Sequence, residues 1–244
     1  MDVNGVGNVR QNKGETIMNI DVDNKQIEIF YNKTSNKKCP VIILNTFSDE
    51  GKEVWRECQK INANDFILVA ISKLNWNDDM TPWECPPIYK GDSNYKGCAD
   101  NYLELIEYEI IPKIQEFIKD EIKMEIDYFG IAGYSLGGLF ALYSGYKTNK
   151  FKRIVSASGS MWYPNFVEYV KKNEISKNIN KIYFSLGNKE KNSKIEMLRT
   201  VEEKTKEICA YLSKNINTTY EENQGNHFQD GILRMAKGIK WILE

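Results

Sequence analysis

The chain has 244 residues, 41% of them hydrophobic, and its 33 basic and 34 acidic residues leave a net charge of -1. This balance offers no electrostatic basis for binding DNA, RNA or an anionic membrane, so we expect no nucleic-acid or membrane partner. The hydrophobic content is enough for one large core, and no linker-like stretch divides the chain. We expect a single domain over residues 15–244, after a flexible N-terminal segment over residues 1–14.

The sequence also bears on where the protein resides. The N-terminus lacks the apolar run of a secretion signal, and no segment is long and apolar enough to cross a bilayer. The five cysteines are scattered without Cys-x-x-Cys spacing, as is typical of reduced thiols in a cytosolic protein. These features predict a cytoplasmic protein.

The first predicted elements are two strands over residues 16–21 and 26–31, in which apolar and polar residues alternate. The residues between them favour a turn, so we expect an antiparallel hairpin at a sheet edge. Later strand candidates are almost continuously apolar, as strands buried on both faces of a parallel sheet are. They cover residues 41–44, 66–71, 128–132, 154–157 and 182–186.

Helical patterns alternate with these strands. In residues 99–119 apolar side chains recur at helical spacing, and we expect Pro112 to kink this helix. The other helices are predicted over residues 53–61, 136–146, 193–213 and 228–243. This alternation predicts an α/β fold with a mostly parallel central sheet, helices on both of its faces and an antiparallel N-terminal hairpin.

The apolar run that begins at Phe129 breaks at Gly133-Tyr134-Ser135-Leu136-Gly137 and continues as an amphipathic stretch. The pattern predicts a strand, a sharp turn and a helix, in which strained backbone geometry exposes the serine hydroxyl. Such a turn is the nucleophile elbow of a serine hydrolase. Because the pattern is short, its meaning depends on the rest of the chain.

A nucleophilic serine needs a base, and histidine suits this role because its ordinary pKa of about 6.5 lies near neutrality. The chain contains one histidine, His227, in a turn-like segment after a predicted strand over residues 217–221. The order serine, acid, histidine is the one expected in this fold. We therefore expect Ser135 to be the nucleophile and His227 the general base.

The acid should lie between these two residues, after the end of a strand. No aspartate occurs between Ser135 and His227. Glu190 directly follows the strand over residues 182–186 and is the favoured orienting acid. Asn188 as a neutral orienter, or a serine–histidine pair that acts without an acid, stays open as an alternative.

An oxyanion hole needs two hydrogen-bond donors. The first candidate is the backbone N–H of Leu136 at the start of the predicted helix, because free amides and the helix dipole favour negative charge there. The second is expected from the turn after residues 41–44, at the N–H of Thr46 or Phe47.

Two loops rich in aromatic residues, 74–87 and 158–164, follow predicted strands. Ligands of open α/β sheets bind at the carboxyl ends of the strands, so these loops are candidate walls of a substrate pocket. A role in packing against the core is an equally good interpretation for any one of their residues. The expected pocket residues are Trp76, Asp79, Met80, Trp83, Tyr134, Met161 and Trp162.

Five motifs, at residues 76–83, 133–138, 158–162, 185–190 and 225–228, together resemble the α/β-hydrolase esterase family of esterase D, enterochelin-type siderophore esterases and feruloyl esterases. The similarity is closest to an unassigned branch of this family and extends over roughly residues 40–244. It implies the α/β-hydrolase fold, with Ser135 as nucleophile, His227 as base and Glu190 at the place of the acid in several relatives. Siderophore esterases often carry an arginine before the Asp-x-Thr-Pro loop, where this chain has Asn75-Trp76-Asn77, which argues against an anionic iron chelate as substrate.

The sequence therefore predicts a serine carboxylesterase that acts on a soluble small-molecule ester and needs no cofactor or metal. Three alternatives remain: acyl transfer with the same triad, a non-catalytic ligand-binding protein on the hydrolase scaffold, and a magnesium site at Asp78 and Asp79. The acyl and alcohol parts of the ester and the oligomeric state are not specified by the sequence.

Overall fold

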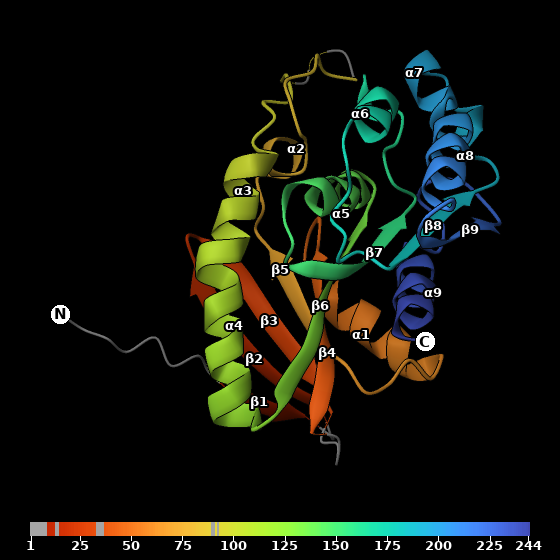
Figure 1. The fold of residues 1–244 in the computed structure, drawn as a ribbon. Helices are drawn as coiled ribbons and strands as arrows, with labels where there is room; N and C mark the ends of the chain where they lie inside the picture. The colour runs from red at the N-terminus through yellow and green to blue at the C-terminus, as the bar shows by residue number, and fades with distance from the viewer. Residues whose placement is uncertain (1–8, 13–14, 33–36, 89–90, 92) are drawn as a thin grey trace.

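The computed structural model describes residues 9–12, 15–32, 37–88, 91 and 93–244, and its strands form one sheet with helices on both faces (Figure 1). Among these residues the sheet has nine strands in the order β1-β2-β3-β5-β4-β6-β7-β8-β9. The strands are β1 (Val9–Asn12), β2 (Glu15–Val22), β3 (Lys25–Tyr31), β4 (Lys38–Asn45), β5 (Ile67–Ser72), β6 (Glu125–Tyr134), β7 (Phe151–Ala157), β8 (Lys181–Gly187) and β9 (Asn217–Asn223).

The helices differ in length and position from the predicted ones at several places. They are α1 (Gly51–Lys60), α2 (Trp76–Asp79), α3 (Ala99–Leu105), α4 (Ile111–Phe117), α5 (Leu136–Lys147), α6 (Phe166–Lys172), α7 (Glu196–Arg199), α8 (Val201–Leu212) and α9 (Gly231–Leu243). Helix α6 was not predicted, and the helix expected over residues 193–213 is divided into α7 and α8.

The pairing of the strands confirms the predicted sheet. Strands β4 to β9 pair in parallel, while β1, β2 and β3 pair antiparallel and β3 joins β5 antiparallel. The β2–β3 hairpin turns at Asp23 and Asn24, which have φ angles of 46° and 61°. Two left-handed residues are what a two-residue hairpin turn requires, and Asp and Asn tolerate that conformation.

The N-terminal segment differs from the expectation of a flexible start. Val9–Asn12 forms β1, which pairs with β2 and makes β1 the edge strand in place of the hairpin. An unpaired strand edge offers free backbone groups, so even a segment without a clear apolar alternation is able to pair there. The rest of the segment expected to be flexible, residues 1–8 and 13–14, lies outside the described residues.

The long helix predicted over residues 99–119 is built from α3 and α4 with a π-helical segment, Ile106–Ile110, between them. Pro112 lies in the first turn of α4. The helix is continuous through this turn, because Ile111 N–H bonds to the Ile106 carbonyl, and Pro112 has no N–H with which to continue that pattern. A second π-helical segment, Ile118–Ile122, follows α4.

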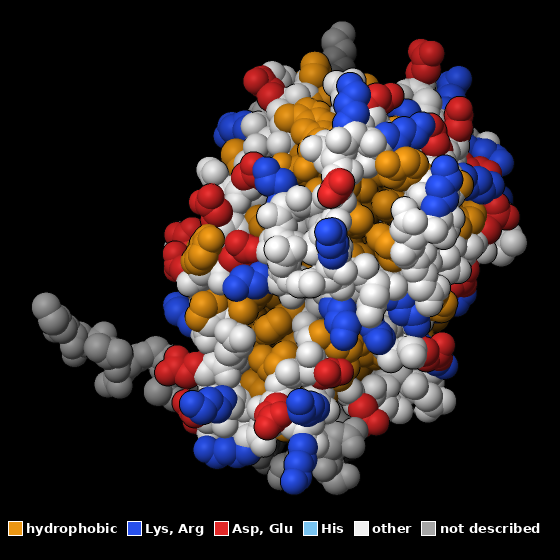
Figure 2. Space-filling model, viewed as in Figure 1, with side chains coloured by type: hydrophobic (Ala, Val, Ile, Leu, Met, Phe, Trp, Pro, Cys, Tyr) orange, Lys and Arg blue, Asp and Glu red, His pale blue; other side chains and the backbone are white. Residues whose placement is uncertain are grey.

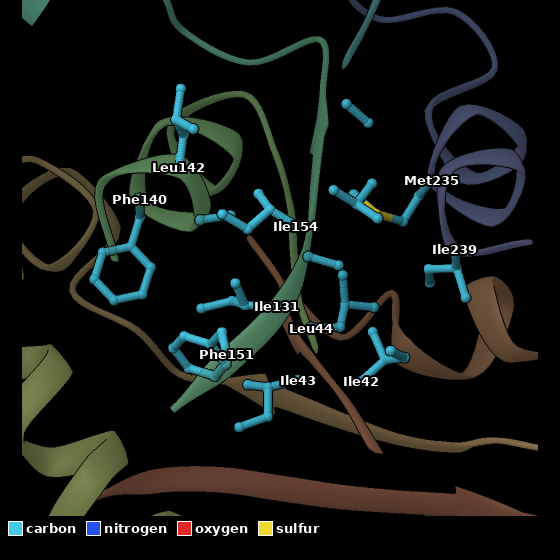
Figure 3. Close-up of a cluster of buried hydrophobic side chains, with 14 of the residues drawn as sticks. Ile42, Ile43, Leu44, Ile131, Phe140, Leu142, Phe151, Ile154, Met235 and Ile239 are labelled. Atoms are coloured by element: carbon cyan, nitrogen blue, oxygen red, sulfur yellow. The ribbon is translucent and has the colours of Figure 1, made fainter. Parts of the chain in front are cut away.

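The core fills both sides of the sheet. Helices α1 and α9 pack together on one face, and α3, α4 and α5 cover the other (Figure 1). Figure 3 shows Phe140 of α5 and Met235 and Ile239 of α9 reaching toward the sheet strands from opposite sides, with Ile131 between them; all four are buried. This packing fixes the carboxyl ends of β4, β6, β7 and β8, which carry the candidate site residues.

The surface shows no segregation of charge in the view of Figure 2, where basic and acidic side chains are interspersed. Of the helices in the described part of the chain, none combines the length and the apolar character that a bilayer-spanning helix needs.

Candidate active site

Ser135 lies in the turn between β6 and α5, and its backbone has φ 56° and ψ -122°. This conformation is rare for a residue with a side chain, and it is the strained geometry expected of a nucleophile elbow. A Cβ at Gly133 would lie 2.2 Å from the backbone of Gly137, so this close approach of strand and helix requires glycine. The local sequence thus forces the turn that exposes the serine.

Three candidate residues from distant parts of the sequence lie side by side. His227 Nε2 is 3.0 Å from Ser135 Oγ, and His227 Nδ1 is 2.8 Å from Glu190 Oε2. The backbone of His227 is held as well, because the Tyr134 hydroxyl donates to its carbonyl oxygen at 2.7 Å. The histidine can therefore pass a proton to and from the serine while its other nitrogen stays on the carboxylate.

Glu190 is buried in the short turn that follows β8. Its Oε1 accepts hydrogen bonds from Gly187 N–H at 2.6 Å, Ser158 Oγ at 2.8 Å and Arg234 Nη1 at 2.9 Å. Burial alone would raise the pKa of Glu190, but the hydrogen bond and charge of His227 and the donors at Gly187 and Ser158 hold it below its ordinary value. The carboxyl group is therefore ionised at neutral pH.

Asn188, the alternative to Glu190, does not contact the histidine ring. Its Nδ2 donates to Gln224 Oε1 at 3.0 Å, and its Oδ1 accepts from Gly225 N–H at 3.1 Å. These bonds tie the end of β8 to the turn that carries His227, which is a supporting role.

The geometry separates the two candidates for the second oxyanion donor. Thr46 N–H donates to the Ile71 carbonyl at 3.0 Å and extends the β4–β5 pairing, so the prediction is wrong for Thr46. Phe47 N–H makes no backbone hydrogen bond to any residue that the structure describes. Leu136 is the first residue of α5, where the N–H has no partner within the helix. Both Leu136 and Phe47 line the cavity in front of Ser135.

That cavity has a volume of about 720 Å³ and is open to solvent on one side. Most of its lining is apolar or aromatic, and among the described residues that line it Lys189 is the one lysine or arginine. Phe47 and Phe228 are 66% and 87% exposed. The apolar lining residues include Phe47, Val54, Trp76, Trp162, Leu198, Val201, Phe228, Ile232 and Met235.

The residues predicted to form the pocket divide into two groups. Trp76, Tyr134 and Trp162 line the cavity, whereas Asp79, Met80, Trp83 and Met161 do not. Met80 and Met161 are fully buried in the core. Asp79 accepts hydrogen bonds from Lys25 Nζ at 2.6 Å and Asn75 N–H at 2.9 Å, which anchor the start of α2.

Trp83 also has a structural role, in packing. It packs against four rings, those of Tyr143, Tyr163, Phe166 and Tyr169. Its Nε1 donates to the Pro164 carbonyl at 3.1 Å. Trp83 therefore joins the two aromatic loops to each other, and the packing interpretation holds for this residue.

Asp78 and Asp79, the carboxylates considered for a magnesium site, are engaged with side chains of the protein. Asp78 accepts from Asn75 Nδ2 at 3.0 Å and forms an ion pair with Lys96 at 3.1 Å, and Asp79 pairs with Lys25. Over the described ranges no three His, Cys, Asp or Glu side chains form a group suited to hold a metal ion.

Sequence analysis missed two residues that bind Glu190, namely Ser158 and Arg234, and Arg234 is the more unexpected of the two. The Arg234 side chain is fully buried, and its Nη1 lies 2.9 Å from Glu190 Oε1 and 3.0 Å from Ser158 Oγ. The position of Arg234 in the sequence could have revealed it. Arg234 lies on the buried face of α9 together with Met235, Gly238, Ile239 and Ile242, and an arginine is rarely buried unless it has a charged or polar partner.

Comparison with known proteins identifies the family of the chain. A family model described as "Putative esterase" matches residues 25–235. The chain is 29% identical over 191 residues to the "Uncharacterized protein YbbA" of Bacillus subtilis (strain 168), an alignment that covers 75% of this chain and 76% of that protein.

Solved structures share the fold at low sequence identity. The siderophore hydrolase EstA from Aspergillus nidulans has a TM-score of 0.72 at 16% identity, with 94% of each chain covered. An IroE-like serine hydrolase from Shewanella oneidensis has a TM-score of 0.71 at 17% identity, with 89% of this chain and 75% of that chain covered. These similarities confirm the α/β-hydrolase fold. Because the family model spans most of the chain, the protein belongs to this esterase family and is a carboxylic ester hydrolase.

Proposed function

We propose that this esterase hydrolyses small esters through an acyl-enzyme on Ser135, with His227 as general base and Glu190 as the orienting acid. One observation carries the proposal: a continuous chain of contacts runs from Ser135 Oγ through both ring nitrogens of His227 to Glu190, at 3.0 and 2.8 Å. Nucleophile and base within hydrogen-bond reach, with the base oriented by a third group, is the arrangement that activates a serine.

In the first half of the reaction, Ser135 Oγ attacks the ester carbonyl carbon while its proton moves to His227 Nε2. The negative charge that develops on the carbonyl oxygen is stabilised by the N–H groups of Leu136 and Phe47. The carbon–oxygen bond to the alcohol then breaks, and the alcohol leaves with the proton from His227. The acyl group is now esterified to Ser135.

In the second half, a water molecule gives a proton to His227 Nε2 and attacks the acyl carbon. The same N–H groups stabilise the second oxyanion, and its collapse returns the proton to Ser135 and releases the carboxylic acid. Glu190 stays ionised throughout, holds the proton on Nδ1 and stabilises the transient imidazolium. Its lowered pKa supports this role.

The cavity supports an uncharged ester with a large apolar group as the substrate. Its volume of about 720 Å³ exceeds what a short acyl chain needs, and its lining is mostly apolar. The lining contains the acidic Glu50 as well as Lys189, and Lys189 is exposed. A multiply charged anion would meet little compensating charge on these described residues.

The proposal is tested by the hydrolysis of p-nitrophenyl butyrate, followed as release of both p-nitrophenol and butyric acid. Ser135→Ala should abolish both, because no nucleophile remains. Ser144→Ala is the matched control, since Ser144 is buried in the same helix α5 and bonds to the Ala141 carbonyl away from the cavity. Butyryl transfer to an added alcohol in place of acid release would show acyl transfer instead of hydrolysis.

A further inference from the structure

Arg234 is a buried cation in a helix whose neighbouring positions are apolar. Its side chain has an exposed fraction of 0%, and it lies among Met235, Gly238 and Ile239 on the buried face of α9. Burying a guanidinium group is unfavourable unless it is paired and hydrogen-bonded. The hydrogen-bond and ion-pair partners of Arg234 should therefore indicate its role.

One nitrogen of the guanidinium group acts on the acid. Nη1 donates to Glu190 Oε1 at 2.9 Å and to Ser158 Oγ at 3.0 Å, and Ser158 itself donates to the same Oε1. Together with Gly187 N–H, these groups occupy Oε1 and leave Oε2 to His227. The carboxylate is unable to rotate without losing several of these bonds.

The other nitrogen acts on the turn that carries the base. Nη2 donates to the carbonyls of Gln224 and Asn226, at 2.9 and 3.0 Å. Nη1 also lies 3.2 Å from the Tyr134 hydroxyl, which binds the His227 carbonyl. One planar group thus connects the acid with the backbone before the histidine and, through Tyr134, with the carbonyl of His227 itself.

The backbone at the end of β8 approaches the guanidinium group closely. A Cβ at Gly187 would lie 2.7 Å from Arg234 Nη2 and 2.4 Å from the Gly225 carbonyl oxygen. The end of β8 therefore packs directly on the guanidinium group and on the turn before His227. Arg234 is not among the residues that line the cavity, so it has no contact with a bound ester.

From this geometry we infer that Arg234 is a positioning residue, which sets the separation of Glu190 and His227 by binding both the carboxylate and the turn before the histidine. The inference rests on the proposed function of the three residues. If Arg234 is a positioning residue, its substitution should lower kcat and leave the binding of the ester unchanged. A lysine keeps the charge but lacks the two-pronged fork that reaches both carbonyls and the carboxylate.

The test measures kcat and KM of Arg234→Met and Arg234→Lys on p-nitrophenyl acetate. A small displacement of a catalytic group lowers the rate on the order of 100-fold, so we expect a loss of this size in kcat for Arg234→Met, with KM changed by less than about threefold. Arg234→Lys should recover about a tenth of the wild-type kcat. Lys237→Met is the matched control, because Lys237 lies one turn further along α9 and pairs with Glu221 of β9 at 2.6 Å.

A pH profile separates positioning from a general loss of stability. The titratable and charged groups around Glu190 are His227, Arg234, Tyr134 and Tyr220. Removal of the cation favours protonation of Glu190, so the loss of kcat/KM at acid pH should begin at higher pH in Arg234→Met. The onset should stay near the wild-type position in Arg234→Lys.

Several results would overturn the inference. A folded Arg234→Met with wild-type kcat and pH profile contradicts it, as does an equal loss in Lys237→Met. If Arg234→Met does not fold, Arg234→Lys decides, and wild-type kcat in that variant contradicts the positioning role. Failure of the proposed function is distinguishable, because Ser135→Ala would then retain the esterase activity of the wild type or the wild type would have none.

Discussion

The polar network around the acid and the apolar wall of the cavity are built by opposite principles. In the network, Glu190, Arg234 and Ser158 are buried and joined by directional bonds of 2.8 to 3.0 Å. In front of Ser135 lies an apolar cavity with an exposed rim at Phe47 and Phe228. The stability and action of the polar network depend on the positions of single atoms, whereas the binding of an ester in the cavity depends on the amount of apolar surface.

This contrast predicts different responses to mutation. Removing one partner of a buried ion pair costs about 3–5 kcal/mol, because the other charge is left uncompensated. Aromatic contacts of the kind that line the cavity are worth about 0.5–1.5 kcal/mol each. Substitutions in the polar network should therefore change the rate and stability strongly, and those in the apolar wall should change the choice of ester.

The largest effect is expected from Glu190→Gln. Gln keeps the shape but not the charge, so it neither stabilises the imidazolium nor holds the tautomer, and kcat on p-nitrophenyl acetate should fall about 10⁴-fold. Asn188→Ala is the control and should lose less than about tenfold. The opposite ranking of the two variants would assign the orienting role to Asn188.

The same variant tests the buried charge through its pH dependence. The pKa of Glu190 lies below its ordinary value of 4.5, so its contribution to stability is complete above pH 4.5 and is lost as the pH falls through the lower folded value. We expect wild type to exceed Glu190→Gln by about 3 kcal/mol in the free energy of unfolding at pH 7. The difference, measured by urea unfolding, should shrink below pH 4.5; a constant difference down to pH 3 is the contrary result.

On the apolar side, Trp76→Ala should change selectivity more than chemistry. Trp76 lines the cavity and contacts Phe47 edge to face with ring centroids 5.4 Å apart. Loss of this surface should lower kcat/KM on p-nitrophenyl octanoate roughly ten- to hundredfold and leave the acetate ester nearly unaffected. Equal losses on both esters would show that the tryptophan supports Ser135 instead of the substrate.

The smallest effect is expected from Trp83→Phe, outside both regions. The variant keeps most of the ring packing but loses the bond from Nε1 to the Pro164 carbonyl. Stability should fall by about 1 kcal/mol, measured by urea unfolding, with unchanged selectivity between octanoate and acetate. A change in selectivity would return Trp83 to the pocket.

The sequence predicted what local patterns encode. The glycines around Ser135 and the strand before it specify the elbow, and the lone histidine and the lack of aspartate limited the partners of the serine. The fold followed from alternating apolar runs. The elbow pattern is strong because it lies within a few residues, and the histidine and the missing aspartate follow from counting residue types along the chain.

What the sequence did not reveal depends on partners distant in the chain. Arg234 has meaning through Glu190, 44 residues away, and Trp83 faces rings from α5 and α6 instead of the cavity. Thr46 is engaged by Ile71, a pairing that exists only once β4 and β5 are adjacent. Each of these facts follows from packing in three dimensions.

The central claim is that Ser135 is a nucleophile activated by His227. A fluorophosphonate probe reacts with such a serine, and intact mass followed by peptide mapping locates the adduct. We predict one adduct per chain on Ser135, none in Ser135→Ala, and much slower labelling in His227→Ala. An unlabelled wild type, or an adduct that persists in Ser135→Ala, would contradict the account.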